Sequence, residues 1–258
     1  MKRDNDTYYF CACSFGKDSI ATILLALWHN EPLDEVVFTE VMFDNQNGIS
    51  GEDPRHIEWV RNHAKPLLEQ MGVKVTILQT EDYISNFHHT ICKSKYTERV
   101  GKVRGYPIGN RCAILRDCKM RTMGKFIREI KARYKHYFQY VGIAFDETER
   151  LARKMMNGHK ISLLSKYQYT EKMAYELCKQ HNLLSPIYDI ALRNGCWFCP
   201  NRNIQTMSNF KKLYPELWQM LLNLDYTPNK VSPCFQYNKT ITQVDKEIDF
   251  AARQLKLF

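Results

Sequence analysis

The feature that most constrains this chain is an apolar run that ends in a short glycine-containing turn and continues as a helical pattern. The apolar run is Tyr8–Cys13, the turn is Ser14-Phe15-Gly16-Lys17-Asp18-Ser19, and the helical pattern ends at Trp28. This order predicts a strand, a loop and a helix. Unpaired N–H groups at a helix start bind anions, and the serines and lysine of the turn add donors and a charge. The stretch therefore predicts a nucleotide site.

The turn resembles the Ser-Gly-Gly-Lys-Asp-Ser loop of the PP-loop ATP pyrophosphatases, which cleave ATP between its α and β phosphates. It is not a Walker A loop. Phe15 stands where that family usually has glycine, and its side chain either narrows the loop or points away from the phosphates. The resemblance implies ATP with Mg²⁺ as the ligand and Lys17 and Asp18 as catalytic residues. The residues that would hold the nucleotide here are Ser14, Phe15, Gly16, Lys17, Asp18 and Ser19.

Strand-like and helical patterns alternate along the chain. The strand-like runs cover 8–13, 36–43, 73–78 and 138–143, and the helical patterns cover 18–28, 54–71 and 123–134. This alternation predicts an α/β fold with a doubly wound, mostly parallel sheet and helices on both faces. The resemblance implies the adenine nucleotide alpha-hydrolase type. We expect a nucleotide-binding domain over 1–200, including the cysteine cluster, and a small helical extension over 201–258.

Length and composition are those of a folded protein with a sizeable core, since 44% of the 258 residues are hydrophobic. The chain shows neither an export signal nor an apolar run long enough to span a bilayer, so we expect a cytoplasmic protein without a membrane partner. Nine cysteines in such a chain favour reduced or metal-bound thiols over a disulfide scaffold. The oligomeric state is not predicted.

The positive charge is concentrated in one stretch. Lys93–Lys135 holds 14 Lys and Arg against three acidic residues, whereas the whole chain carries a net charge of +9. One interpretation is a solvated helix face together with groups that neutralise the nucleotide. The other is a surface for a larger polyanion such as tRNA or DNA.

Loops after parallel strands meet at one edge of the sheet, so two further loops join the predicted nucleotide site. The resemblance to the PP-loop families implies that the adenine lies near the turn after the second strand, so Met42, Phe43 and Asp44 are candidates for contact with it. The Asn-Gln-Asn-Gly sequence that follows Asp44 is also ordinary turn chemistry.

The loop after the fourth strand resembles the Gly-Ile-Arg-x-Asp-Glu-x-x-Arg segment of the phosphoadenosine phosphosulfate (PAPS) reductase branch of the PP-loop superfamily. The matching residues are Gly142, Asp146, Glu147 and Arg150, which the resemblance assigns to nucleotide binding. Ala144 replaces the usual arginine and removes a fork of donors suited to phosphate or sulfate. Glu147 and Arg150 also have the spacing of an exposed i,i+3 ion pair.

Four cysteines form a second group of candidate functional residues. Cys196 and Cys199 belong to a Cys-x-x-Cys turn, and Cys112 and Cys118 lie upstream with five residues between them. Four thiolates from two pairs suit tetrahedral zinc or a [4Fe-4S] cluster, and ligand softness does not choose between them.

Two further segments resemble the PAPS reductases: Lys119-Met120-Arg121-Thr122-Met123, similar to Lys-Ile-Arg-Pro-Ile, and Ser185-Pro186-Ile187-Tyr188-Asp189, similar to Asn-Pro-Leu-Tyr-Asp. The related adenosine phosphosulfate reductases and DNA phosphorothioation enzymes bind a [4Fe-4S] cluster, so the resemblance favours that cofactor over zinc. It also implies that Lys119 and Arg121 act on the α phosphate or the acceptor.

The function predicted from these motifs is transfer of an adenylyl group from ATP to an acceptor, in preparation for sulfur transfer. The acceptor is not named by the sequence and could be tRNA, DNA or a small molecule. Reduction of a sulfonucleotide is an alternative, although the Glu-Cys-Gly-Leu-His nucleophile motif of the true reductases is missing. A third alternative is a non-catalytic subunit that binds a nucleotide or a nucleic acid.

Overall fold

The computed structural model describes residues 4–107, 112–154, 158–191 and 194–254. By its internal contacts the chain forms two compact units. The first comprises Met1–Glu40, Asp53–Gln79 and Arg121–Asn194, and the second comprises Val41–Glu52, Thr80–Met120 and Gly195–Phe258. This division differs from the predicted boundary at residue 200, because two stretches from the first half of the chain pack with the C-terminal helices.

The first unit contains a sheet of five parallel strands in the order β5-β2-β1-β7-β8. Its strands are β1 (Thr7–Ala12), β2 (Glu35–Glu40), β5 (Val75–Gln79), β7 (His136–Tyr140) and β8 (Lys160–Ile161). The four longer strands fall on the four apolar runs of the sequence. The predicted fold class, α/β with a mostly parallel sheet, is confirmed.

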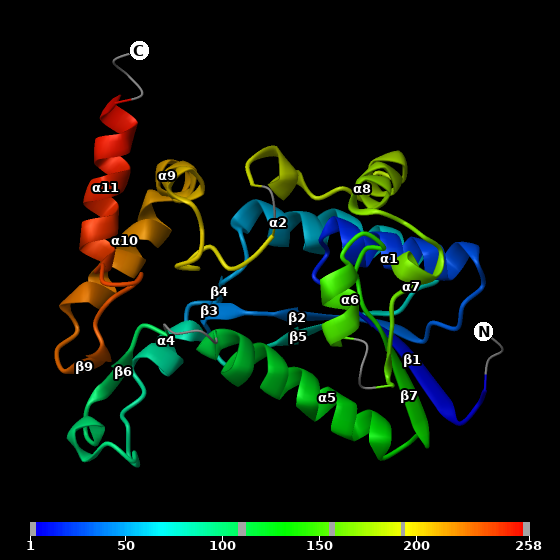
Figure 1. The fold of residues 1–258 in the computed structure, drawn as a ribbon, viewed down its shortest axis with the longest axis horizontal. Helices are drawn as coiled ribbons and strands as arrows, with labels where there is room; N and C mark the ends of the chain where they lie inside the picture. Colours follow the sequence, from blue (N-terminus) through cyan, green and yellow to red (C-terminus); the bar gives the residue numbers. More distant parts are fainter. Residues whose placement is uncertain (1–3, 108–111, 155–157, 192–193, 255–258) are drawn as a thin grey trace. The chain divides into compact units, whose positions relative to one another are not determined.

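Helices cover both faces of this sheet (Figure 1). One layer includes α1 (Lys17–Trp28), α2 (Pro54–Trp59), the π-helical turn η1 (Val60–Ala64), α3 (Lys65–Gln70), α7 (Leu163–Lys166) and α8 (Glu171–Gln180). The other is α5 (Arg121–Lys131), which lies below the sheet in Figure 1. The unit also holds α6 (Thr148–Lys154) and the 3₁₀ turn η5 (Pro186–Asp189).

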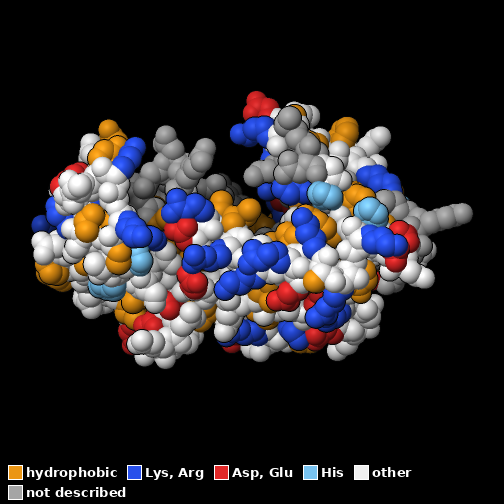
Figure 2. Space-filling model, turned by 90° about the horizontal axis from the view of Figure 1, so that it is seen from below, with side chains coloured by type: hydrophobic (Ala, Val, Ile, Leu, Met, Phe, Trp, Pro, Cys, Tyr) orange, Lys and Arg blue, Asp and Glu red, His pale blue; other side chains and the backbone are white. Residues whose placement is uncertain are grey.

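The helical pattern over 123–134 places Met123, Ile127 and Ile130 on one face, and in α5 this face packs against the sheet. Met123, Ile127 and Ile130 lie with Phe10 and Val37 in one hydrophobic cluster. The opposite face of α5 carries exposed Lys and Arg side chains, and Figure 2 shows basic groups over this helix with acidic groups among them. The larger cluster on the other sheet face is built around α1, where eight consecutive residues, Ser19–Ala26, are buried.

The second unit is mostly helical. Its elements are β3 (Met42–Asp44), β4 (Ile49–Ser50), α4 (Tyr83–Phe87), the 3₁₀ turn η2 (Thr97–Arg99), β6 (Val103–Gly105), the π-helix η3 (Leu115–Met120), α9 (Ile204–Leu213), α10 (Pro215–Asn223), the 3₁₀ turn η6 (Leu224–Tyr226), β9 (Lys230–Ser232) and α11 (Ile241–Gln254). None of the helices in the described residues of either unit combines the length and apolar character that crossing a membrane requires.

The single strand predicted over 36–43 is two strands. β2 ends at Glu40, and β3 begins at Met42 and pairs antiparallel with β4. Phe43 packs with Tyr83, Trp197 and Phe198 in the core of the second unit, at ring-centroid distances of 5.4, 4.5 and 5.4 Å. The apolar run is continuous because it supplies two cores in succession.

From β1 the chain adds β2 and β5 on one side of the sheet and β7 and β8 on the other, so the switch point of the strand order lies between β1 and β7. Ligands bind at such switch points in open parallel sheets. The loop after β7 passes close to the start of α1 at Gly142. A Cβ atom on Gly142 would lie 2.7 Å from the carbonyl carbon of Asp18 and 2.7 Å from the backbone nitrogen of Ser19. Only glycine fits this approach without displacing the first turn of α1.

We therefore expect Gly142→Ala to lower the free energy of unfolding by about 1–3 kcal/mol, the usual cost of overpacking. Gly124→Ala is the matched control, because a Cβ there meets only the Arg128 guanidinium at 4.0 Å and alanine favours the helix. Urea unfolding of both variants measures the difference. A Gly142→Ala protein as stable as the wild type would show that the close approach does not constrain the fold.

Candidate functional site

The predicted phosphate loop joins β1 to α1. Gly16 is the N-cap of α1 and has an extended backbone conformation. Because glycine has no side chain, the helix starts without a side-chain cap. The Lys17 N–H donates to the Tyr188 hydroxyl oxygen at 2.9 Å, and the Ser19 hydroxyl donates to the Gly16 carbonyl at 2.9 Å. The first turn of α1 thus lies at the carboxyl end of the sheet, and one of its N–H groups is bonded to a polar side chain.

Phe15 turns its side chain away from the loop opening. Its ring is completely buried and packs edge-on against Phe38 and Trp59, with centroids 5.4 and 6.5 Å apart. Its φ of 55° lies in the left-handed region that glycine adopts freely. Of the two orientations considered from the sequence, the structure has the second, so only the backbone of Phe15 could face a nucleotide.

Three side chains hold the loop in place. The Ser14 carbonyl oxygen is 3.1 Å from Nε2 of His56 and accepts from the Asn194 amide at 3.1 Å. His56 is buried, and its Nδ1 lies 2.8 Å from the Ser185 hydroxyl. Sequence reasoning missed His56, Asn194 and Tyr188. Tyr188 and Ser185 lie in the segment that resembles the reductases, whereas His56 and Asn194 carry no local signal.

Lys17 is held by two carboxylates. Its ammonium lies 2.8 Å from Asp18 and 2.8 Å from Glu171 at the start of α8. Burial disfavours the charge on Lys17, but the hydrogen bonds to both carboxylates raise its pKa above the usual lysine value. Burial raises the pKa of Asp18, and the bond to Lys17 only partly offsets this.

A cavity of about 430 Å³ opens beside the loop within the first unit. Of the described lysines and arginines, Lys160 and Arg150 line it and Lys17 does not. Lys160 was not predicted, because it follows no motif and starts the short strand β8. The lining residues are Ala12, Ser14, Gly16, Asp18, Ser19, Gln139, Val141, Gly142, Ile143, Arg150, Lys160, Tyr188 and Asn194.

The segment after β7 divides into supporting and cavity-facing residues. Glu147 accepts from the Ala144 N–H at 3.0 Å and from Arg150 at 2.7 Å, and Asp146 accepts from the Glu171 N–H at 3.1 Å. Glu147 and Arg150 therefore do form the i,i+3 pair, while Arg150 also lines the cavity. Ala144 is completely buried, so no side chain from that position reaches a ligand.

Met42, Phe43 and Asp44 belong to the second unit. Met42 and Phe43 are buried, and Asp44 caps its own turn by accepting from the N–H groups of Gln46 and Asn47 at 2.9 and 3.2 Å. None of the three lines the cavity beside the loop. Their contact with adenine stays a prediction.

The Cys-x-x-Cys turn is anchored by the two aromatic residues inside it. Trp197 donates from its backbone to Gly51 and from its indole to Ser50, both at 2.9 Å. Phe198 packs on Tyr83 with centroids 4.3 Å apart, and it leaves no room for a Cβ at Gly51. The turn is therefore rigid, as a metal-ligating turn must be.

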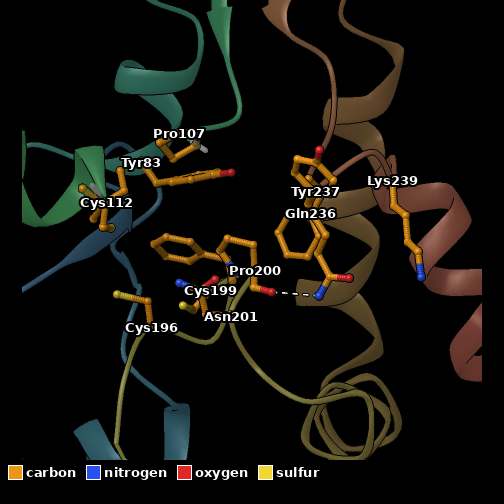
Figure 3. A pocket seen from close by; sticks show the side chains of 13 residues that line it. Tyr83, Pro107, Cys112, Cys196, Cys199, Pro200, Asn201, Gln236, Tyr237 and Lys239 are labelled. Atoms are coloured by element: carbon orange, nitrogen blue, oxygen red, sulfur yellow. Dashed lines mark hydrogen bonds between the residues drawn. The ribbon is translucent and has the colours of Figure 1, made fainter. Parts of the chain in front are cut away.

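Three of the four predicted thiols share a cavity of about 670 Å³ in the second unit. Cys112, Cys196 and Cys199 line it, as Figure 3 shows. Cys118 is buried in the core instead, 3.4 Å from the Asn86 amide. Cys112 precedes the helical segment and is exposed, whereas Cys118 lies within the π-helix η3 and is buried.

Lys119 and Arg121 fall in different units. Lys119 makes a 3.2 Å ion pair with the buried Glu52. Burial opposes the charge, but Glu52 and the nearby Cys196 raise the pKa of Lys119. Arg121 is the first residue of α5 and is exposed. Their catalytic roles stay predictions.

Two properties of the thiols bear on metal binding. Burial, followed by the nearby Glu52 carboxylate, raises the pKa of Cys196 to about 12. Among the described residues, no group of three or more His, Cys, Asp or Glu side chains lies close enough to hold a metal ion. The chemistry of three thiols around one cavity fits an iron–sulfur cluster or zinc, but the side chains would have to converge to bind either.

No protein-family model matches this chain, and no curated protein matches it. Among solved structures, it is similar to the U34-tRNA thiolase NcsA from Methanococcus maripaludis, determined with its [4Fe-4S] cluster. The two are 14% identical, the match covers 96% of this chain and 73% of that one, and the TM-score is 0.43. A likeness at this level does not establish a family or an activity.

The buried ring of Phe15 yields a stability prediction. Phe15→Gly should lower the free energy of unfolding by about 2–4 kcal/mol, because the cavity it leaves costs more than the relief of the positive φ returns. Phe15→Leu keeps most of the volume and should lose less. Urea unfolding compares the two. If glycine at this position is neutral, the ring does not anchor the loop.

Proposed function

We propose that this chain is a PAPS reductase-like PP-loop enzyme that cleaves ATP between its α and β phosphates and adenylylates an acceptor for sulfur transfer. The observation that carries the proposal is the position of the loop Ser14–Ser19. It lies at the switch point of a parallel sheet, opens onto a polar cavity, and is braced through the Ser14 carbonyl.

The nucleotide phosphates would bind at the first turn of α1, with Ser14, Gly16 and Ser19 supplying donors. Arg150 and Lys160 supply the positive charge that already lines the cavity. Lys17 would exchange one of its two carboxylate partners for a phosphate, leaving Asp18 near the Mg²⁺ ion. Fixed charges of this kind stabilise the charge that develops as the α–β bond breaks.

The acceptor would meet the α phosphate through Lys119 and Arg121. The pairing with Glu52 keeps Lys119 protonated and limits the directions in which its ammonium can point. Met42, Phe43 and Asp44 would contact the adenine, and Gly142, Asp146 and Glu147 would shape the loop that carries Arg150.

The thiols of Cys112, Cys196 and Cys199 would hold a [4Fe-4S] cluster, with zinc as the alternative. Cys118 would become a fourth ligand only by leaving its packing beside Asn86. A cluster held there would carry a sulfide or set the local charge. The role of this chain's residues is to present the thiols from a turn that Trp197 and Phe198 keep rigid.

Lys17→Ala tests the phosphate loop. We expect it to abolish pyrophosphate release from ATP and Mg²⁺, a loss on the order of 2–4 kcal/mol of transition-state stabilisation. Lys172→Ala is the control, because Lys172 is exposed on α8 next to Glu171, and this variant should behave as the wild type. Pyrophosphate is measured with candidate acceptors present.

Near wild-type turnover by Lys17→Ala would overturn the assignment of the loop. ATP binding without any turnover in the wild-type protein, across tRNA, DNA and small-molecule acceptors, would favour the non-catalytic alternative.

Cys196→Ser tests the metal. Protein purified without oxygen should show broad visible absorbance and about four irons per chain, and Cys196→Ser should lose both. Cys178→Ser is the matched control, because that buried thiol donates to the Lys17 carbonyl at 3.1 Å and serine can do the same. Colourless protein with one bound zinc would replace the cluster by the alternative metal, and metal-free wild-type protein would remove the site.

A further inference from the structure

A short hairpin forms one wall of the cysteine cavity. Gln236 and Lys239 exchange backbone hydrogen bonds of 3.0 and 3.1 Å, and the Gln236 amide donates to the Pro200 carbonyl at 2.7 Å. Tyr237 stands at the tip with 86% of its surface exposed. The hairpin thus ties an exposed aromatic ring to the residue that follows the Cys-x-x-Cys turn.

The lining of this cavity suits a flat, polar-edged ring. Figure 3 shows Tyr83, Pro107 and Cys112 on one side, with Tyr237, Gln236 and Lys239 on the other. Phe198 and Phe235 add further aromatic surface, and Asn201 and Gln236 add amides that can both donate and accept. Among the described residues that line the cavity there is no Asp or Glu. Aromatic faces combined with amides are how proteins hold an unstacked nucleobase.

A basic arm leads to the same cavity. It is the segment Lys93–Lys102, whose Lys93, Lys95, Arg99 and Lys102 are exposed. Tyr96 in this arm is exposed, with the Lys95 ammonium 4.8 Å and the Arg99 guanidinium 4.3 Å from its ring centre. Interleaved basic and aromatic side chains of this kind bind single-stranded nucleic acid through phosphates and stacked bases.

The arm and the hairpin are joined by one backbone ladder. β6 directly follows the arm and pairs in parallel with β9, and the Tyr106 N–H donates to the Ser232 carbonyl at 3.0 Å. A Cβ on Gly105 would lie 2.4 Å from that carbonyl, so the two strands approach very closely. Pro107 after β6 and Phe235 after β9 both reach the cavity.

From this arrangement we propose that the second unit binds single-stranded nucleic acid, with the strand along the arm and one base in the cysteine cavity against Tyr237. The proposal rests on the proposed function in one respect, that the base in the cavity is the acceptor. The binding itself requires no turnover. Double-stranded nucleic acid does not fit, because its bases are stacked inside the helix.

The test measures binding of fluorescein-labelled 12-nucleotide RNA and DNA single strands to the full chain by anisotropy, without ATP. Tyr237→Ala should weaken binding at least about 5-fold, the loss of one base stack, and Tyr237→Phe should not. Tyr226→Ala is the matched control, since that tyrosine is 80% exposed in the same unit but does not line the cavity.

The arm is tested by Lys95→Gln with Lys102→Gln. The slope of log affinity against log salt should become shallower by about 0.7 for each phosphate that the variant no longer neutralises. Lys212→Gln with Lys246→Gln, two exposed lysines on α9 and α11, should leave the slope unchanged.

Equal binding by Tyr237→Ala and the wild type, an equal loss in Tyr226→Ala, or equally tight binding of a duplex would each overturn the proposal. Absence of strand binding by the wild-type protein would also overturn it. Pyrophosphate release that depends on Lys17 would then still support the enzyme, so the two failures are distinguishable.

Discussion

The first turn of α1 lies at the carboxyl end of the sheet, and contacts from several parts of the first unit hold it there. The loop before it reverses through a positive φ at Phe15, whose ring is driven into the core against Phe38. The Ser14 carbonyl is held from outside by the buried His56. The loop after β7 can approach this turn only because Gly142 has no Cβ. Packing on several sides thus fixes the loop at which we propose that phosphates bind.

The charged side chains at this site form ion pairs with one another in the absence of a ligand. Lys17 lies between Asp18 and Glu171, so any phosphate bound there would have to compete with two carboxylates for its ammonium. Arg150 is likewise paired with Glu147, yet it faces the cavity. Such pairing costs affinity but fixes the positions of the cations, and fixed charges are the ones that favour a transition state over a substrate.

Much of the first unit could be predicted from sequence, because a parallel sheet buried on both faces needs continuous apolar strands and helices with one apolar face. The strands β1 and β7 and the buried face of α5 followed directly from this pattern. The end of β2 did not. The apolar run continues through Phe43 because that residue packs in the core of the second unit. The hydrophobicity of a residue does not indicate which of two cores its side chain belongs to.

The sequence by itself determined the order strand, loop and helix, the Cys-x-x-Cys turn and the α/β class, since these depend on residue type and local spacing. Tertiary structure decided where the side chains point. It buried the ring of Phe15, gave Lys17 its partner on α8, and placed Cys112 at a cavity but Cys118 in the core. The physical reason is that direction depends on what packs from distant parts of the chain, and local sequence does not contain those neighbours.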